Sequence, residues 1–354
     1  MTLYVRSYSF SDPSFSDSPV VENDEGTRTF RDQVRSAGQQ YIAVIIKEVT
    51  DTENTVVKVI KKDATELYET TINKNAKLWD VNDNGEVLLY TETVSNGSTT
   101  RELICIDNTG SVKWSVDLGS TTPNAIEIGT DYAGIVVGSN VRFFSAADGS
   151  EVNSFDTGHS ITGNGKYQKC YGSADGFTLV YPTKPASDKN GVVFANADGD
   201  VWYYEYGNTR QLFITGRDIH CGRVSVWQQW VSYRWIFSAL FRTGEKPTID
   251  TGESPYSAPP GDCVISPCGE WIAWAYNNKI RLYYVAQSEL KEISETSYAS
   301  GQSGEKYIDL SFYGKYALIL HDSNTLCVYE LKAQAHKDSL DNPLGTRAVM
   351  LCSD

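Results

Sequence analysis

A turn signal recurs along the chain about every 40 to 53 residues, each time between two short apolar segments. The seven turns are centred near Gly38, Gly85, Ala133, Gly176, Gln229, Gly269 and Gly314. A period of this size leaves room for about four short strands in each repeat. The sequence therefore predicts an all-β chain of seven four-stranded antiparallel sheets, with less than about a tenth of its residues in helices.

The clearest repeat runs from Cys263 to Ser294. Its four strands are CVIS, EWIAWAY, KIRLYYVA and LKEIS, and Asn277-Asn278 supplies the positive φ angles of a tight hairpin. Within it, SPCGEWIAWAY resembles a strand pair of WD40-like and TolB-like propellers, with Cys268 where Asp is usual. The resemblance implies a seven-bladed β-propeller of four-stranded antiparallel blades.

Two further segments, Glu102–Leu118 and Val141–Gly158, each contain a strand, a turn ending in Gly and a second strand. They resemble the outer hairpin of quinoprotein-like (PQQ-type) repeats. In that resemblance Trp114 and Phe155 occupy the usual aromatic position. No adjacent cysteine pair and no matching acidic set accompany it, so we expect the architecture without the cofactor.

The last repeat shows three strands, YIDLSF, KYALILH and NTLCVYELK, so we expect a terminal strand to close the ring. Leu3–Phe10 is the first candidate for that strand and Arg347–Cys352 the second. The expected organisation is an N-terminal strand with an irregular connection (1–26), the propeller (27–335) and a C-terminal tail (336–354).

The formal net charge of −14 argues against nucleic acid and anionic membrane as partners, because both attract basic surfaces. No basic segment precedes an apolar one at the N-terminus, and no apolar run approaches the roughly 18 residues of a membrane helix. The seven cysteines form no CxxC pair and are expected to be buried free thiols. We therefore expect a soluble protein of the cytoplasm, or of a virion assembled there.

The motifs of covalent and metal-dependent hydrolysis, GxSxG and HExxH, are absent from the sequence, and its four histidines are scattered. We expect no catalytic residue, no cofactor and no metal. Asp80, Asn82 and Asn84 match half of a calcium loop, but Thr91 replaces the bidentate Glu at its twelfth position. An Asx-rich hairpin turn explains the same residues.

Aromatic residues cluster at Trp227, Trp230, Tyr233 and Trp235. They could form a protein-docking patch or a sugar-stacking platform, and packing between blades is the simpler interpretation. The leading hypothesis is a non-enzymatic interaction or structural propeller that binds other protein subunits, including those of a virus or phage particle or another large assembly. The alternatives are a glycan-binding propeller and a hydrolase or lyase with acidic residues at the central channel.

Overall fold

The computed structural model describes residues 3–9, 14–21, 28–36, 38–48, 53–95, 97–161, 178–183, 190–207, 209–215, 223–231, 234–241, 244–251, 263–266, 268–286, 289–311 and 313–341. These residues form 29 strands and no helix, so the predicted all-β class is confirmed. Accordingly, the described part of the chain holds no helix with the length and hydropathy to span a bilayer.

The chain divides into two compact units. Unit 1 comprises Met1–Gly172, Gly176–Thr183 and Ala195–Val201, and unit 2 comprises Ser173–Asp175, Lys184–Phe194 and Trp202–Asp354. The division falls within the three-stranded sheet β15-β16-β17, whose strands are Thr178–Thr183, Asn190–Asn196 and Val201–Gly207.

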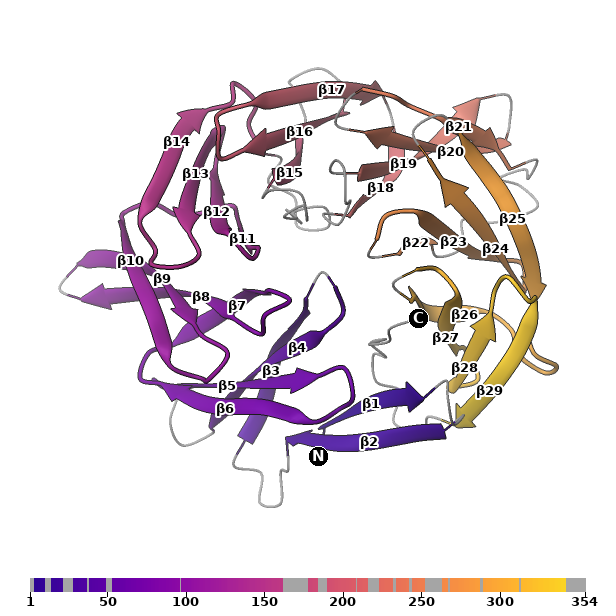
Figure 1. Cartoon of the computed structure of the whole chain (residues 1–354), viewed down its shortest axis with the longest axis horizontal. Coiled ribbons are helices and arrows are strands. Elements are labelled where there is room, and N and C mark those ends of the chain that lie inside the picture. Colours follow the sequence, from indigo (N-terminus) through magenta and orange to yellow (C-terminus); the bar gives the residue numbers. More distant parts are fainter. Residues whose placement is uncertain are drawn as a thin grey trace. The chain divides into compact units, whose positions relative to one another are not determined.

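Unit 1 contains three four-stranded antiparallel sheets, called sheets 1, 2 and 3 below, and the β1-β2 hairpin (Figure 1). The hairpin strands are β1 (Leu3–Ser9) and β2 (Ser14–Val21). Sheet 1 is β3 (Arg28–Arg35), β4 (Tyr41–Glu48), β5 (Thr55–Lys61) and β6 (Glu66–Ile72). Sheet 2 is β7 (Ala76–Val81), β8 (Val87–Ser95), β9 (Ser98–Ile106) and β10 (Val112–Gly119). Sheet 3 is β11 (Ala125–Ile128), β12 (Tyr132–Val137), β13 (Asn140–Ser145) and β14 (Glu151–Asp156).

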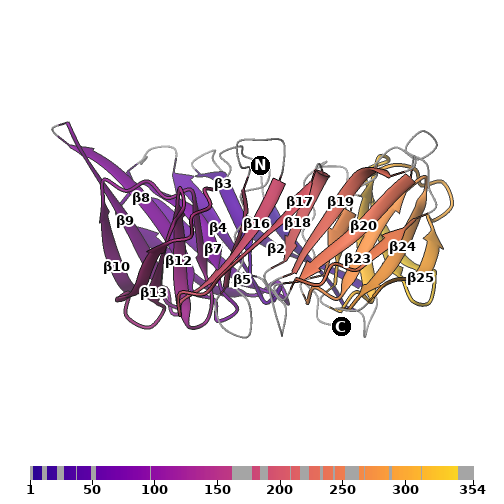
Figure 2. The same ribbon diagram turned by 90° about the horizontal axis from the view of Figure 1, so that it is seen from above.

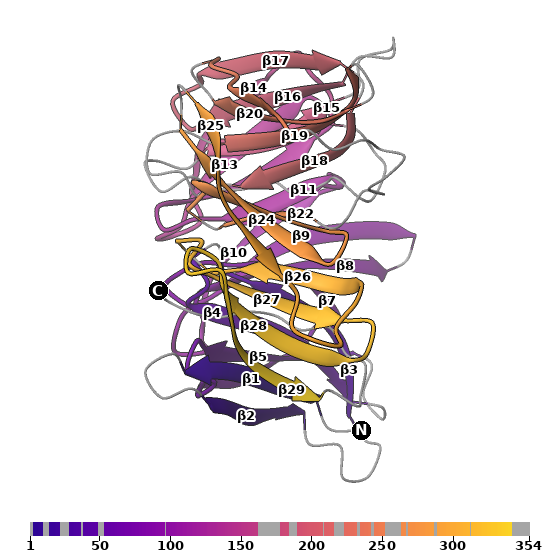
Figure 3. The same ribbon diagram turned by 90° about the vertical axis from the view of Figure 1, so that its right-hand side faces the viewer.

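Unit 2 contains three more sheets of the same antiparallel order, and Figure 3 shows the strands of the last one side by side. One is β18 (Thr209–Thr215), β19 (Arg223–Val231), β20 (Arg234–Phe241) and β21 (Thr248–Asp250). The next is β22 (Cys263–Ile265), β23 (Trp271–Tyr276), β24 (Lys279–Val285) and β25 (Leu290–Ser297). The last is β26 (Glu305–Leu310), β27 (Tyr316–His321), β28 (Thr325–Glu330) and β29 (Ala335–Asp341).

The first half of β8, Val87–Tyr90, shows why the central strands carry apolar residues at successive positions. Val87 and Leu89 pack in one core with residues of sheet 1, whereas Leu88 and Tyr90 pack in a second core with residues of sheet 3. Successive side chains of a strand point to opposite faces of its sheet. A strand whose sheet packs between two others therefore needs apolar side chains on both faces. Each buried aliphatic side chain contributes roughly 1.5–3 kcal/mol to this packing.

Four of the seven predicted turns lie where the sequence places them, at Gly38, Gly85, Gly269 and Gly314. Two are wrong. Ala133 lies inside β12 and Gln229 inside β19, because a short apolar segment near a polar residue gives the same pattern in a strand as beside a turn. Gly176 lies outside the described residues.

The predicted closing strand is also wrong. The last sheet has its own fourth strand, β29, and β1 pairs with β2. The sequence did not predict β29 because Ala335–Asp341 is mostly polar. The strand lies at the outer edge of its sheet. Residues 14–21 form a strand where the sequence predicted an irregular connection, and Arg347–Cys352 lies outside the described residues.

In sheets 1 and 2, a side chain of the fourth strand contacts the turn between the third and fourth strands of the following sheet. The Tyr68 ring of β6 lies against Gly110, and the Trp114 indole of β10 lies against Gly149. Trp114 also donates a hydrogen bond from Nε1 to the Ala146 carbonyl, at 2.9 Å. Trp114 therefore fixes the β13–β14 turn to the edge of sheet 2.

In sheet 3 the corresponding residue is Asn153 and not Phe155, because Asn153 follows Gly149 by the same four positions as Trp114 follows Gly110. Asn153 donates from Nδ2 to the Ala197 carbonyl at 2.9 Å. Phe155 instead stacks on Phe143 of its own sheet, with ring centroids 6.0 Å apart. The aromatic position predicted at Phe155 is therefore corrected to Asn153.

The β8–β9 hairpin extends beyond the other strands of sheet 2 (Figure 2). The innermost strand begins at Ala76, which pairs with Thr91, so the hairpin continues past that pair to Ser95 and Ser98. Val94, on this extension, is 69% exposed.

Candidate functional site: a pocket between two turns

A five-residue turn joins the first and second strands in four of the sheets. It begins at Ser36, Asn82, Ser266 and Ser311. The Oγ of Ser266 accepts a hydrogen bond from the Trp271 amide at 3.1 Å, and the Oγ of Ser311 accepts one from the Tyr316 amide at 3.0 Å. A short polar side chain at the first position thus satisfies backbone donors that a turn leaves unpaired.

The residue after this turn covers the turn of the following sheet. Trp271 lies against Gly314 in unit 2, and Tyr41 lies against Gly85 in unit 1. Both glycines have positive φ, 69° and 79°. The missing side chain lets an aromatic ring approach the backbone closely.

Between sheets 2 and 3 this pattern is broken at both partners. Glu86 stands where Tyr41 and Trp271 carry a ring, because its carbonyl accepts the amide of the first residue of its turn, as theirs do. Val87 instead packs in the core shared with sheet 1. The turn of sheet 3 is only three residues long, Gly129–Asp131. A carboxylate in place of a ring therefore lies beside a shorter turn, and an open pocket of roughly 440 Å³ lies there. Its lining residues are Asn84, Glu86, Lys113, Thr130, Asp131, Tyr132, Ser145, Ala147 and Val152.

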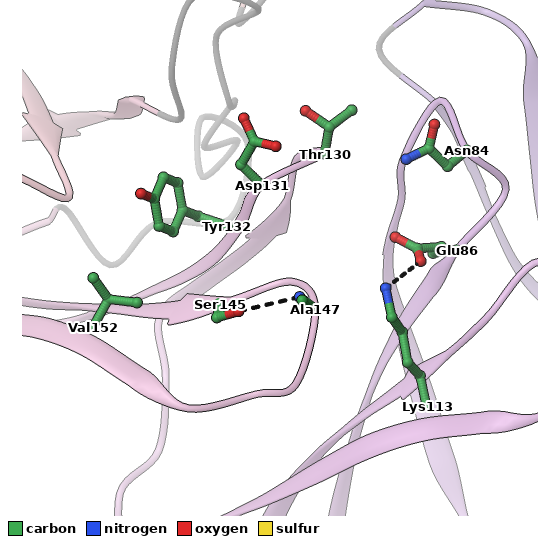
Figure 4. Close-up of a pocket in the computed structure, with 9 residues that line it drawn as sticks. All are labelled: Asn84, Glu86, Lys113, Thr130, Asp131, Tyr132, Ser145, Ala147 and Val152. Carbon is green, nitrogen blue, oxygen red and sulfur yellow. Dashed lines mark hydrogen bonds and ion pairs between the residues drawn. The ribbon is translucent and has the colours of Figure 1, made fainter.

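One wall of the pocket carries a buried ion pair (Figure 4). Glu86 is only 8% exposed and accepts a hydrogen bond from Lys113 Nζ at 2.6 Å. Its other carboxylate oxygen accepts one from Asn82 Nδ2 at 2.8 Å. Burial lowers the pKa of Lys113, but the hydrogen bond and the charge of Glu86 outweigh it, so the pKa of Lys113 is raised and its ammonium group stays protonated.

The turn itself does not require a buried charge at this position. The residues whose carbonyls close the other three turns in the same way are Tyr41, Trp271 and Tyr316, and none of them is charged. Burying a carboxylate is costly unless other groups hydrogen-bond to it. Glu86 is therefore a feature of this pocket and not of the repeat.

The opposite wall comes from sheet 3 (Figure 4). Thr130 and Asp131 belong to its short turn, Tyr132 begins β12, and Val152 lies on β14. Val152 is 49% exposed, which makes it one of the few large apolar side chains at the described surface.

The predicted calcium residues lie beside this pocket and join its two walls. Asp80 accepts hydrogen bonds from the Val81 amide at 2.8 Å and, through its other oxygen, from the Ile128 amide at 2.9 Å. Asn82 accepts from the amides of Asn84 and Glu86, both at 3.0 Å. Its Nδ2 also donates to the Gly129 carbonyl at 2.9 Å.

Asp80 and Asn82 therefore link β7 to the end of β11, and Asn82 builds the Asx-type turn that was the alternative interpretation of the motif. The Asn84 side chain lines the pocket. No group of three or more His, Cys, Asp or Glu side chains in the described part of the chain has the arrangement of a metal site.

The predicted aromatic interaction residues are placed only in part. Trp227 and Trp230 lie on β19 and Trp235 on β20, with Trp227 opposite Phe237 in the ladder. Their side chains and the whole of Tyr233 lie outside the described residues. Whether they form a docking patch stays a prediction.

His321 is fully buried at the end of β27. Its Nδ1 lies 2.9 Å from the Gly304 carbonyl and its Nε2 lies 2.9 Å from the Tyr329 hydroxyl. Because the carbonyl can only accept, Nδ1 carries the proton in this arrangement. His321 thereby ties the chain before β26 to β28.

No protein-family model and no curated protein sequence matches the chain. Solved structures do match. A eukaryotic initiation factor structure has a TM-score of 0.52 at 10% identity and covers 97% of this chain and 96% of its own. The C-terminal WD40 domain of Sif2 has a TM-score of 0.51 at 12% identity, covering 92% and 88%. Hsv2 from Kluyveromyces lactis has a TM-score of 0.51 at 11% identity, covering 89% and 99%.

These similarities span nearly the whole chain and define its fold as a WD40-like β-propeller. The predicted resemblance of SPCGEWIAWAY to WD40-like propellers is therefore confirmed at the level of the fold. At such low identity they define nothing beyond the fold, because one fold can carry many functions.

Proposed function

We propose that this chain is a protein-binding propeller and that the pocket between the β7–β8 and β11–β12 turns holds part of its partner. The observation that carries the proposal is the local break in the repeat, where Glu86 replaces an aromatic residue and the turn Gly129–Asp131 is short, so that an open pocket remains. Departures from an otherwise consistent pattern are concentrated at functional sites.

The make-up of the pocket supports binding. It has polar side chains that can form hydrogen bonds and an apolar wall residue, Val152, exposed at the surface. A few oriented polar groups beside apolar surface are typical of recognition sites. Trp114 and Asp80 fasten its two walls to each other, so the pocket needs little rearrangement to bind.

Site-specific photo-crosslinking in cells that make the protein tests the proposal. A photoreactive residue replaces Val152 at the pocket, Val94 on the β8–β9 hairpin or Ile293 on β25, three apolar positions that are all exposed. We expect a discrete crosslinked protein from position 152. That protein is then purified and its affinity measured for the wild-type chain and for two variants.

Ala147→Tyr should obstruct the pocket and weaken binding at least tenfold, by about 1.4 kcal/mol or more. Ile293→Tyr, a surface change outside the pocket, should leave the affinity unchanged. Equal crosslinking at all three positions, or full affinity of the Ala147→Tyr variant, would contradict the proposal. Binding of a glycan instead of a protein would favour the glycan-binding alternative, and turnover of a substrate would favour the enzyme.

We further propose that the partner belongs to a larger assembly, such as a virus or phage particle. The support is compositional, since the acidic, Ser- and Tyr-rich chain carries no catalytic motif. Sedimentation of native extracts tests this, because the chain should travel with a particle and not as a monomer.

A further inference from the structure

The pocket carries a net negative charge. Its lining contains two carboxylates, Glu86 and Asp131, and one ammonium group, Lys113. Lys113 is held by Glu86 at 2.6 Å, so its charge is already compensated. The carboxylate of Asp131, exposed on the opposite wall, has no hydrogen bond or ion pair with any described side chain or backbone group.

Two flanking turns add to this charge. The hydroxyl of Thr109 holds the pKa of Asp107 below its ordinary value, and the hydroxyl of Ser150 does the same for Asp148. Both carboxylates are therefore ionised at neutral pH, and they stand on the turns from which β10 and β14 begin. The whole chain, at −14, strengthens the attraction for a cation.

Two other residues of the pocket lining, Asn84 and Tyr132, can accept hydrogen bonds from the N–H groups of a cationic side chain. Asn84 offers an amide oxygen from the sheet 2 wall, and Tyr132 offers its ring and hydroxyl beside Asp131 (Figure 4). Aromatic rings and carboxylates together favour guanidinium and ammonium groups. A carboxylate ligand would be repelled by the negative charges of Asp131 and the buried Glu86.

We propose that this pocket receives a Lys or Arg side chain of the partner protein. The inference rests on the proposed function, because it names the part of the partner that occupies the same site. In this arrangement Asp131 attracts the incoming cation, and Lys113, which is 28% exposed, opposes it. The two side chains should therefore affect binding in opposite directions, a result that simple loss of structure would not give.

The probes are four peptides that differ in one residue, acetyl-Gly-Ser-X-Ser-Gly-amide with X as Arg, Lys, Gln or Glu. Their binding to the full chain is measured by NMR titration across the millimolar range. The Arg and Lys peptides should bind, the Gln peptide at least about tenfold more weakly, and the Glu peptide not at all. Equal binding of the Gln peptide, or no binding of any peptide, would overturn the inference.

Three variants assign the effect to the pocket. Asp131→Asn should weaken the Arg peptide about tenfold, whereas Lys113→Gln should strengthen it severalfold. Asp198→Asn is the matched control, because it makes the same change of charge on another exposed turn of unit 1 and should have no effect. Weakening by both Asp131→Asn and Lys113→Gln, or equal weakening by Asp198→Asn, would refute the role of the pocket charge.

The outcomes for the two proposals can be separated. If a partner crosslinks at position 152 and Asp131→Asn leaves its affinity unchanged, the protein-binding function stands and the cationic occupant is refuted. If no partner crosslinks there, the proposed function itself fails.

Discussion

The indole of Trp271 lies so close to Gly314 that a Cβ at position 314 would stand 2.3 Å from the Trp271 Cγ. In unit 1 the Tyr41 ring lies against Gly85 in the same way, though less closely, at 3.4 Å from a Cβ at that position. Both glycines belong to a turn that joins the first two strands of a sheet, and each aromatic residue begins the second strand of the sheet before it. The turn glycine and the ring of the preceding sheet are therefore a matched pair.

Gly314→Ala should strongly destabilise the protein. The positive φ of 69° costs a non-glycine residue about 1 kcal/mol, and displacing the Trp271 ring costs about 1–3 kcal/mol more. Gly301→Ala is the control, since Gly301 also has a positive φ, 81°, but nothing lies within 4 Å of its added Cβ. Denaturant unfolding should show a loss of about 1 kcal/mol for Gly301→Ala and clearly more for Gly314→Ala. Equal losses would contradict the contact.

The sequence predicted the repeating sheets well, because their signals are local. The strands β23 and β24 and the Asn277-Asn278 turn between them were all predicted, and both asparagines have positive φ. By contrast, β29 is polar and β2 is rich in Ser, so neither shows the apolar pattern on which strand prediction depends.

The pocket could not be predicted from any single segment. It arises from two departures, Glu86 at an aromatic position of sheet 2 and the short turn Gly129–Asp131 in sheet 3, which matter only because they line the same pocket. Aligning the repeats on their turn glycines puts Val87 at the aromatic position, and only the backbone hydrogen bonds assign that position to Glu86. The Lys113–Glu86 pair gives no such signal, because its residues are 27 positions apart, one on β10 and the other in the β7–β8 turn.

Trp114→Phe should destabilise unit 1. The Trp114 Nε1 donates to the Ala146 carbonyl at 2.9 Å in a buried place, and losing such a bond costs about 1–3 kcal/mol when the acceptor stays unpaired. Trp79→Phe is the control, because the buried Trp79 Nε1 has no hydrogen-bond partner among the described residues. The unfolding free energy should fall more for Trp114→Phe, and the reverse order would contradict the hydrogen bond.

Asp80→Ala should destabilise the protein in the same way with or without calcium. Its two oxygens accept the Val81 and Ile128 amides, so its removal leaves buried donors unpaired, at a cost of about 1–3 kcal/mol. We expect neither calcium nor EDTA to change the thermal midpoint of the wild-type chain. A calcium-dependent rise that Asp80→Ala abolishes would instead establish a metal site.

Acid should weaken the protein partly through Glu295. Burial raises its pKa, but hydrogen bonds from Lys279 at 2.6 Å and Arg281 at 2.8 Å outweigh it, so the pKa falls from 4.5 to about 2. A depressed carboxyl pKa stabilises the folded state above pH 4.5, and that stability is lost as the pH falls towards 2. Glu295→Gln should reduce the pH dependence of unfolding over this range.

The control for that experiment is Glu292→Gln on the same strand, whose carboxylate lies 3.7 Å from Arg281. It should leave most of the acid dependence in place. An acid dependence that both variants retain in full would contradict the assignment to Glu295.

Truncation after Gln334 should be far more damaging than deletion of residues 1–11. It removes β29, which pairs with β28 from Thr325↔Asp341 to Glu330↔Ala335, and it leaves β28 as an unpaired sheet edge. We expect the thermal midpoint to fall by roughly 10 °C, since each kcal/mol of stability lost lowers it by about 2–4 °C in a domain of roughly 150–250 residues. Deleting residues 1–11 removes β1, whose described ladder is with β2, so its effect should be much smaller.

Truncation after Asp341 keeps β29 and is the matched control for loss of the C-terminal residues. A larger fall on deleting residues 1–11 than on truncation after Gln334 would show that the N-terminal strand, and not β29, completes the last sheet.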